Sequence, residues 1–340
     1  MHRCLHRAAL VLTLVAALPV ASARAAGPSA REIAAVKRGV VDVNVELAAQ
    51  DARAAGTGML LGPSGVVLTN NHVVRGGTNI RVTVHGGRRF AATVLGTDVA
   101  KDVAVLKIPR LPPGTAPVTL GDSSRLAAGQ AVAAIGNAGG SGGKPSVARG
   151  KITGLHRSVT ALDDLGSRAE HLKGMIRVSA RLRPGDSGGP LVDAAGRVIG
   201  MDTAGTDDAE LTGRASAGFA IPIDRAARIA GRIEAGRGSD EIHIGDAASL
   251  GVEVLSDGPA PNPGGGAFVA AVISGSPAAS AGLSAGDVIT ELGGATVGSA
   301  EELERRLGAH HPGDAITVTW RDPLGAPHAA NIVLGTGPPA

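Results

Sequence analysis

Short apolar runs separated by Gly, Pro and Ser turns constrain the fold of this chain more than any other feature of its sequence. In Val40–Leu47, apolar side chains alternate with Asp42, Asn44 and Glu46, which is typical of a strand with one buried face. Comparable runs follow at Gly58–Leu61, Val66–Thr69, Asn79–Val84, Phe90–Leu95, Val103–Ile108, Ala131–Ile135, Lys151–Leu155, Met175–Ser179, Leu191–Val192, Val198–Thr203 and Gly218–Ile221. Many short strands joined by tight turns favour antiparallel barrels or sandwiches.

The composition indicates how such strands can form a core. Among 340 residues there are three Phe, one Trp and no Tyr, so the core must consist of Ala, Val, Ile and Leu. The 51 glycines indicate many turns and few long helices. A chain of this length can form two or three domains, each with its own core.

Two breaks in the pattern divide the chain. The Pro-rich segment Leu111–Pro117 separates the strand-like runs into two halves of similar size within residues 27–230. Residues 231–246 lose the alternation, and we interpret them as a linker to a smaller domain at 247–340. There the pattern mixes strands with two helices, one of them marked by the capping box Ser299–Glu302. The strands are expected at Leu250–Val254, Phe268–Ile273, Asp287–Glu291, Ala315–Trp320 and Ala330–Leu334, and the helices at Pro277–Ala281 and Ala300–Leu307.

Residues 1–26 have the pattern of a secretory signal peptide. Basic residues Arg3 and Arg7 precede the apolar run Ala8–Val20, which small residues follow. The run is short for a membrane span, and an uncleaved anchor is the alternative. The signal contains the only cysteine, Cys4, so the mature protein has no disulfide. We therefore expect a protein that is secreted or located in the periplasm or cell envelope.

The charge balance argues against a nucleic-acid partner. The chain has 33 Lys and Arg and 30 Asp and Glu, and three of the arginines lie in the signal segment. The mature chain is therefore close to neutral, without the basic surplus that binding to phosphate backbones requires.

A serine flanked by glycines is the strongest chemical signal in the chain. Ser187 lies in Arg183-Pro-Gly-Asp-Ser-Gly-Gly-Pro-Leu-Val192. A serine nucleophile needs a general base, and the base needs a group that holds its tautomer and orientation. His72 follows a strand-like run and can serve as the base, and Asp102 opens an apolar run in which burial can hold its carboxylate against the imidazole. The glycines allow the N–H groups of Gly185 and Ser187 to converge on a developing oxyanion.

Residues 30–230 resemble the HtrA family of trypsin-fold serine proteases, and the remainder resembles the single PDZ domain of that family. The motifs are "TGMLLGPSGVVLTNNHVV", "KDVAVLKI", "AIGN", "RPGDSGGPLVDAAGRVIGMDT" and "GFAIPI". The resemblance implies a mainly β protein with two six-stranded antiparallel barrels followed by a small α+β PDZ domain. It also implies a His72–Asp102–Ser187 triad, an oxyanion hole at Gly185 and Ser187, polypeptide substrates such as unfolded or damaged proteins, and no cofactor or metal.

Three alternatives compete with this interpretation. Asp98 is a rival to Asp102 as the orienting carboxylate. The glycine-flanked Ser187 also fits the nucleophile turn of α/β-hydrolases, but that fold needs the order Ser, Asp, His and alternating strands and helices. A chaperone-like scaffold that binds peptides through the PDZ domain with little proteolysis is the alternative function.

The chain departs from the family pattern beside the nucleophile. Asp186 stands where the family usually has Asn, and a buried carboxylate is costly unless it is paired. We expect one of three arginines, Arg149, Arg157 or Arg183, to neutralise it.

The family resemblance also locates the expected substrate pocket, at Leu182, Arg181 and Thr203. Leu182 favours a small or medium apolar P1 side chain, whereas an inward Arg181 would favour an acidic one. Family trimers use aromatic residues near the mature N-terminus, and residues 27–60 have none, so a homo-oligomer is possible but a trimer is left open.

In the PDZ domain, the segment Ser249–Val252 matches the loop that binds a peptide carboxylate. The backbone N–H groups of Leu250, Gly251 and Val252 are the expected donors. Leu303 on the helix Ala300–Leu307 is expected to form the opposite wall of the groove, although leucines on this helix could equally fill the core.

Overall fold

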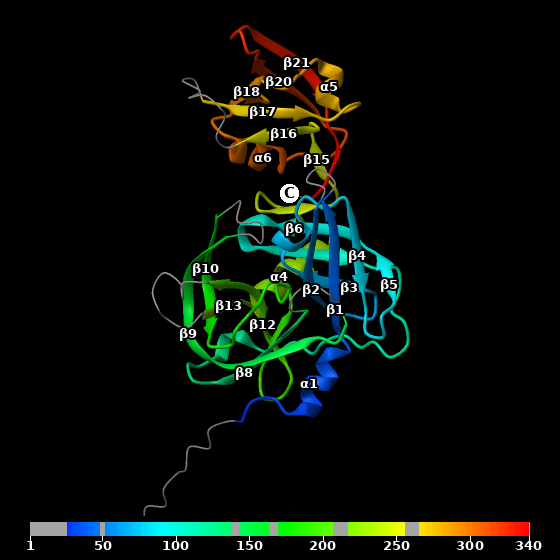
Figure 1. The fold of residues 1–340 in the computed structure, drawn as a ribbon, viewed down its shortest axis with the longest axis vertical. Helices are drawn as coiled ribbons and strands as arrows, with labels where there is room; N and C mark the ends of the chain where they lie inside the picture. Colours follow the sequence, from blue (N-terminus) through cyan, green and yellow to red (C-terminus); the bar gives the residue numbers. More distant parts are fainter. Residues whose placement is uncertain are drawn as a thin grey trace, which may run out of the picture.

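The computed structural model describes residues 26–47, 52–137, 143–162, 169–206, 217–255 and 265–339. The expected signal segment lies outside these residues, apart from Ala26. The chain forms two β units that pack side by side and a smaller module beyond them (Figure 1).

The first unit is an eight-stranded antiparallel sheet in the order β14-β6-β7-β3-β2-β1-β4-β5. Its strands are β1 (Val40–Leu47), β2 (Ala52–Leu60), β3 (Val66–Thr69), β4 (Asn79–Thr83), β5 (Arg89–Ala91), β6 (Thr93–Asp98), β7 (Val103–Lys107) and β14 (Ile242–Ile244). Only Ala92 separates β5, which pairs with β4, from β6, which pairs with β7. This bent segment, formed by β5 and β6, connects the two ends of the sheet. If β5 and β6 are taken as one strand, the six strands expected of a barrel are present, and β14 is an additional strand beside β6.

The second unit is a closed barrel in the order β10-β13-β12-β11-β8-β9. Its strands are β8 (Ala131–Gly136), β9 (Ser146–Leu162), β10 (Ala169–Val178), β11 (Pro190–Val192), β12 (Val198–Thr206) and β13 (Ala217–Pro222). Six antiparallel strands close the barrel, and the prediction of a mainly β, barrel-forming chain is confirmed.

Helices that the strand pattern did not predict join the two units. They are α1 (Ala30–Lys37), which starts at a capping box of Ser29 and Glu32, and α4 (Ile223–Glu234). Two short turns also matter: α2 (Asn71–Val74) after β3 and the 3-10 turn η2 (Val99–Lys101) before β7.

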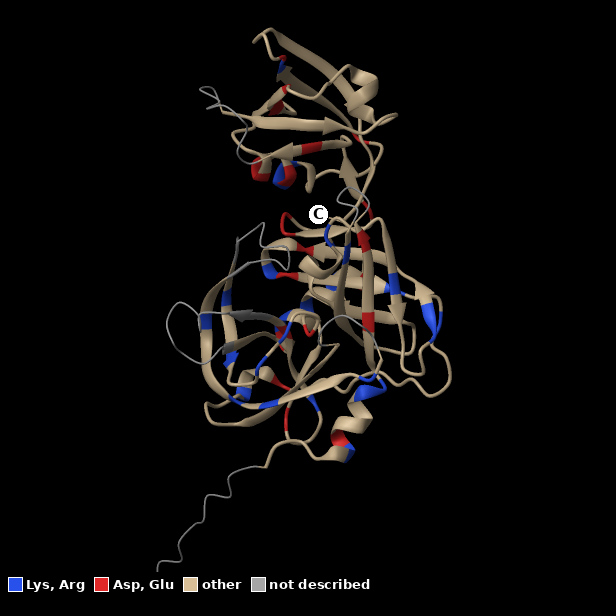
Figure 2. Ribbon diagram, viewed as in Figure 1, with Lys and Arg blue, Asp and Glu red and all other residues tan. Residues whose placement is uncertain are grey.

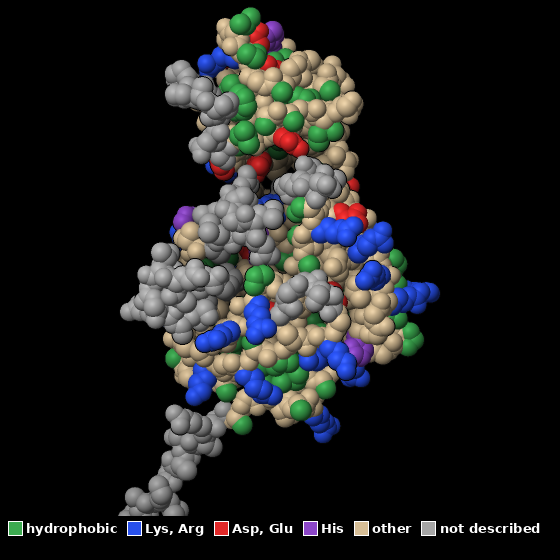
Figure 3. Space-filling view, in the orientation of Figure 1, with side chains coloured by type: hydrophobic (Ala, Val, Ile, Leu, Met, Phe, Trp, Pro, Cys, Tyr) green, Lys and Arg blue, Asp and Glu red, His purple; other side chains and the backbone are tan. Residues whose placement is uncertain are grey.

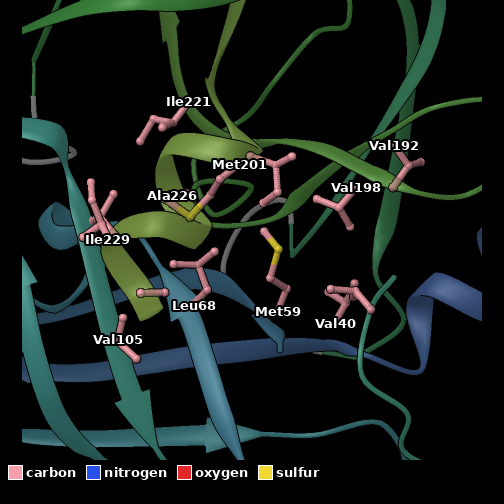
Figure 4. Packing of buried hydrophobic residues seen from close by; sticks show 14 of the residues in the cluster. Val40, Met59, Leu68, Val105, Val192, Val198, Met201, Ile221, Ala226 and Ile229 are labelled. Carbon is pink, nitrogen blue, oxygen red and sulfur yellow. The ribbon is translucent and has the colours of Figure 1, made fainter. Parts of the chain in front are cut away.

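The largest apolar cluster lies between the two β units. Figure 4 shows Ala226 and Ile229 of α4 packed among Leu68 and Val105 of the first sheet and Met201 of the second barrel. These side chains are buried almost completely, and apolar burial of this kind contributes about 25 cal/mol per Å². The cluster therefore fixes the two units against each other, and with them any groups that meet at their junction.

The C-terminal module has its own apolar core, which includes Leu250, Val269 and Trp320. Its sheet runs in the order β16-β17-β18-β20-β21, which leaves β16 at an edge. The elements are β15 (Ala247–Ser249), β16 (Val252–Leu255), β17 (Ala267–Val272), α5 (Pro277–Ala281), β18 (Val288–Leu292), β19 (Ala295–Thr296), α6 (Ala300–Leu307), β20 (Ala315–Arg321), β21 (Pro327–Val333) and β22 (Gly335–Gly337). Both helices lie where the sequence predicted them.

The segment 231–246, which was interpreted as a linker, is largely structured. It contains the end of α4 and all of β14, whose three residues pair with β6 of the first sheet. A strand of three residues is too short for the alternation of side chains to show. The His243 ring also contacts the C-terminal module, since its Nδ1 lies 3.0 Å from the Gly308 carbonyl oxygen.

Candidate active site

A histidine and an aspartate meet where the first sheet faces the second barrel. His72 lies on α2, and Asp102 follows η2 with a left-handed φ of 54°. The His72 Nδ1 atom lies 3.0 Å from both carboxylate oxygens of Asp102, and the His72 backbone N–H donates to Oδ1 at 3.0 Å. The Asp102 side chain is fully buried and that of His72 is 8% exposed. These contacts fix the ring so that Nδ1 faces the carboxylate and Nε2 faces away from it.

Thr203 of β12 links this pair to Ser187. Its hydroxyl donates to Asp102 Oδ2 at 2.5 Å, and its carbonyl oxygen accepts a hydrogen bond from the Ser187 hydroxyl at 2.9 Å. The sequence predicted Thr203 as a pocket residue, whereas the structure places its side chain on the orienting carboxylate. All three predicted catalytic residues therefore contact one another or share Thr203 as a neighbour.

The turn before Ser187 presents backbone N–H groups. Arg183–Asp186 forms a β-turn closed by a 2.9 Å bond from the Asp186 N–H to the Arg183 carbonyl oxygen. Pro184 in the second position and Gly185 in the third, with φ 92°, are the residues that a type II turn favours. Within the described residues, neither the Gly185 N–H nor the Ser187 N–H donates a hydrogen bond. Both groups are thus available to an oxyanion.

Thr57 of β2 clamps this turn from the first sheet, and sequence reasoning missed it. Its N–H donates to the Ser187 carbonyl oxygen at 2.8 Å, and its hydroxyl donates to the Gly185 carbonyl oxygen at 2.6 Å. A Cβ on Gly188, whose φ is 85°, would collide with the Thr57 carbonyl oxygen. The only available signal was the position of Thr57 in the motif "TGMLLG". Gly188 is therefore needed for the close approach of the two β units rather than for the oxyanion hole.

Among the described residues Asp186 forms no ion pair with an arginine, and of the three arginines expected to neutralise it, Arg149, Arg157 and Arg183, only the charge of Arg183 acts on it. Its carboxylate accepts the Arg183 backbone N–H at 3.0 Å and the Ser146 hydroxyl at 3.2 Å. The Arg149 guanidinium instead donates to the Pro28 carbonyl oxygen. Burial, opposed by these two donors and the Arg183 charge, raises the pKa of Asp186.

The segment before Ser187 has one inward residue and one outward residue. Leu182 is half-buried and lies over Gly218 of β13, where a Cβ would approach its Cγ to 2.8 Å. The Arg181 side chain is exposed, so an inward guanidinium that would select an acidic P1 residue is not observed. Leu182 packs against the apolar cluster inside the second barrel.

The rival carboxylate, Asp98, serves the turn that carries Asp102. Its Oδ1 accepts the Lys101 N–H at 3.0 Å and so caps η2. No group of three or more His, Cys, Asp or Glu side chains that could hold a metal ion occurs among the residues described.

Charged side chains form no single patch on the visible face. Figure 2 shows Lys and Arg distributed over several strands, and Figure 3 shows them as separate groups on the first two β units. Within the described ranges, no helix is long and apolar enough to cross a membrane.

Comparison with known proteins identifies both parts of the chain. Residues 56–201 match the trypsin-like peptidase domain, and residues 248–321 match the PDZ domain. The serine protease Do-like HtrA of Lactococcus lactis subsp. lactis is 34% identical over 291 residues, which are 82% of this chain and 70% of that protein. The chain belongs to the HtrA family of serine proteases. The prediction of that family and fold is confirmed, and the scaffold alternative is not favoured.

Other HtrA relatives are similar at comparable levels. Serine protease PepD of Mycobacterium tuberculosis and the periplasmic serine endoprotease DegP of Escherichia coli are each 34% identical, over 82% and 78% of this chain. The chain spans 60% of PepD and 54% of DegP. The structure of the HtrA-type protease AlgW with a tripeptide is 30% identical, with a TM-score of 0.52, and the alignment covers 92% of this chain and 99% of that one.

The carboxylate-binding loop predicted for the PDZ domain of this HtrA protein lies at the start of edge strand β16. Leu250 is buried in the core, and Gly251, with φ 75°, turns the chain into β16. The Gly251 carbonyl oxygen accepts the Ile273 N–H at 2.9 Å. This bond flanks the pair Val252↔Val272, so the Val252 N–H points to the open edge.

Leu303 does not line an open groove in this HtrA structure. Its side chain is 1% exposed and packs in the apolar core of the PDZ domain, whereas the neighbouring Leu307 is only partly buried. The amphipathic pattern of α6 could not distinguish a core leucine from a groove leucine, because both lie on the face toward the sheet.

Proposed function

We propose that this HtrA-family chain is a serine endopeptidase that cleaves peptide bonds through an acyl-enzyme. The observation that carries the proposal is the buried Asp102–His72 pair joined through Thr203 to Ser187, beside the Gly185 and Ser187 N–H groups, which have no acceptor among the described residues. In this mechanism His72 is the general base, Asp102 orients it, and Ser187 is the nucleophile.

The contacts support the following order of steps. The Ser187 hydroxyl, which bonds to the Thr203 carbonyl oxygen here, turns about its Cα–Cβ bond toward His72 Nε2 and gives up its proton as its oxygen attacks the peptide carbonyl. The N–H groups of Gly185 and Ser187 stabilise the oxyanion. The imidazolium then protonates the leaving amine, and a water activated by His72 hydrolyses the acyl-enzyme. No step requires a cofactor.

A covalent probe tests this proposal directly. A fluorophosphonate reacts with a serine activated by a base, so it is expected to label the wild-type protein and to leave Ser187→Ala unlabelled. Ser64→Ala, which changes an exposed loop serine, is the matched control and should label like the wild type. Labelling that persists in Ser187→Ala, or no labelling of the folded wild-type protein, would contradict the proposal.

For the second module, we propose that the PDZ domain binds C-terminal peptides of apolar character by β-augmentation at β16. Two features support it: the unpaired edge of β16 and the Gly251 turn, from which the backbone of Leu250, Gly251 and Val252 leads onto that edge. Backbone N–H groups gathered in such a turn suit a terminal carboxylate.

Gly251→Ala is expected to weaken peptide binding about tenfold or more, because left-handed strain of about 1–3 kcal/mol adds to a collision with the Ser276 side chain. Gly245→Ala is the matched control: Gly245 also has a positive φ, 80°, but open space around its Cβ position. The measurement is fluorescence anisotropy with a labelled decapeptide that ends in free Val, and circular dichroism checks folding. Equal binding by the same peptide with a C-terminal amide would refute the carboxylate loop.

The substrates and the location of the enzyme are also proposals. Leu182 supports cleavage after small or medium apolar residues, which are exposed in unfolded or damaged proteins. The signal-like residues 1–26, together with a relative named a periplasmic endoprotease, support a secreted or periplasmic protein. A homo-oligomer is compatible with these features, but no contact described here argues for a particular number of subunits.

A further inference from the structure

A second aspartate, Asp202, lies directly behind the nucleophile. Its N–H donates to the Gly189 carbonyl oxygen at 2.8 Å, and its carbonyl oxygen accepts the Gly188 N–H at 2.7 Å. Both glycines follow Ser187, so the backbone of Asp202 holds one side of the nucleophile turn. The other side is held by the carboxylate of Asp186, through the Arg183 N–H and the Ser146 hydroxyl.

The Asp202 carboxyl group has no use in the mechanism described above. Asp202 is 0% exposed, and neither side-chain oxygen has a hydrogen-bond partner. It lies opposite Ala220 of β13, whose side chain belongs to the apolar interior of the second barrel. An ionised carboxylate in such a place lacks both solvent and a donor, which makes the charged form costly.

The surroundings of Asp202 supply no compensating cation. β11 and β13 carry no charged side chain, and Asp186 is the one charge that acts on the Asp202 carboxyl among the described residues. Burial and this like charge together raise the pKa of Asp202 well above its usual range. The charged or titratable residues of the other elements packed on β12 are Arg149, Lys151, His156 and Arg157 of β9 and Asp224, Arg225, Arg228, Arg232 and Glu234 of α4.

Asp186 and Asp202 therefore differ in how readily their carboxyl groups ionise. Asp186 accepts two hydrogen bonds and lies near the Arg183 charge, whereas Asp202 has none of these. Of two interacting acids, the one with donors ionises first, and its charge then opposes ionisation of the other. Asp186 is therefore the acid of the pair that ionises more readily, and Asp202 is the one that keeps its proton to higher pH.

We propose that Asp186 and Asp202 form a dyad beneath the oxyanion hole, and that Asp202 is a positioning residue that must keep its proton for the enzyme to work. When that proton leaves, Asp202 and Asp186 carry like charges that act on each other next to the turn that presents Gly185 and Ser187. Their repulsion displaces the turn, the oxyanion donors diverge and hydrolysis slows. The inference rests on the proposed serine endopeptidase activity, since that activity is its readout.

The test compares kcat/KM of the wild type, Asp202→Asn and Asp42→Asn on a quenched fluorescent peptide from about pH 5 to 10. The wild type is expected to lose activity on the alkaline side by about tenfold per pH unit, the slope for one essential proton. The amide introduced by Asp202→Asn keeps the shape of a protonated carboxyl group but cannot ionise, so that variant should retain its activity into the alkaline range.

Asp42→Asn is the matched control. Asp42 of β1 is also buried, and desolvation raises its pKa to about 6, but the groups that act on it, the Gly143 N–H and the Arg89 charge, lie outside the nucleophile turn. The pH profile of kcat/KM for Asp42→Asn should follow that of the wild type. The pKa values of both Asp42 and Asp202 are raised in the folded protein. Each carboxyl group therefore lowers the free energy of unfolding as the pH rises above the pKa that the group has in the unfolded chain. Thermal melts should therefore show each Asn variant gaining stability over the wild type as pH increases.

The outcomes separate the two proposals. Coincident alkaline limbs for the wild type and Asp202→Asn would overturn the dyad and leave the protease assignment intact. If Asp202→Asn is folded by circular dichroism but inactive at every pH, the inference also fails, because a neutral isostere should suffice. Absence of both hydrolysis and fluorophosphonate labelling in the wild type would instead refute the proposed function.

Discussion

Replacing His72 by alanine is expected to lower kcat by about 10⁶-fold, and the double variant with Ser187→Ala should be no worse than either single variant. The reason is that the hydroxyl is a weak nucleophile without the base, and the base has no proton to move without the hydroxyl. The structure joins the two residues through Thr203 and Asp102, so we expect them to act as a unit. Single-turnover hydrolysis of a peptide ester measures the effect.

His171→Ala serves as the control for the histidine change. The His171 ring contacts the Thr160 hydroxyl on β9, the neighbouring strand of the second barrel. The kcat of His171→Ala should remain within about threefold of the wild-type value, as expected for a change at the surface. Losses in His72→Ala and Ser187→Ala that multiply in the double variant would mean that the two residues work independently, contrary to the mechanism.

Asp102→Asn is expected to lower kcat by about 10⁴-fold with little change in fold. In the wild type, the Asp102 carboxylate accepts bonds from the His72 ring, the His72 N–H and the Thr203 hydroxyl. An amide at this position can present an N–H to Nδ1 and stabilise the wrong imidazole tautomer. The measurement is kcat as a function of pH, together with the near-ultraviolet circular dichroism of the folded protein.

Asp98→Asn separates this effect from a general effect of removing a buried carboxylate. Asp98 is 2% exposed and caps η2 without touching His72. Losing part of the cap costs about 1 kcal/mol of stability, so the melting temperature should fall while kcat changes little. A loss of kcat in Asp98→Asn that equals the loss in Asp102→Asn would reassign the orienting role.

Except for β14, the strands of both β units could be predicted from the pattern of apolar residues, because they bury apolar side chains. β1 at Val40–Leu47 and β3 at Val66–Thr69 have the predicted bounds. α4 was missed because its apolar residues follow the strand of Gly218–Ile221 without a break, and its first residue is preceded by a proline rather than a side-chain cap. β14 was missed because it exists only through its pairing with β6.

In the candidate site, too, residues in local motifs could be predicted, whereas residues that act through long-range contacts could not. His72, Asp102 and Ser187 could be predicted because each lies in a motif, and the order of the three motifs along the chain is that of the trypsin fold. Thr57 and Asp202 could not, because their roles depend on contacts with the nucleophile turn from strands distant in sequence. Asp186 illustrates the same limit: the sequence indicates that its charge needs compensation, but not that two neutral donors would act beside the Arg183 charge.

The pairing of β14 with the first sheet affects how a polypeptide bound by the PDZ domain would reach the candidate active site. Only Gly245 and Asp246 lie between β14 and β15, and two residues span at most about 7 Å. If the PDZ domain binds a chain end as proposed, this short connection keeps the bound chain close to the first two β units. Its transfer to Ser187 would then be an intramolecular event, with a local concentration in the millimolar range.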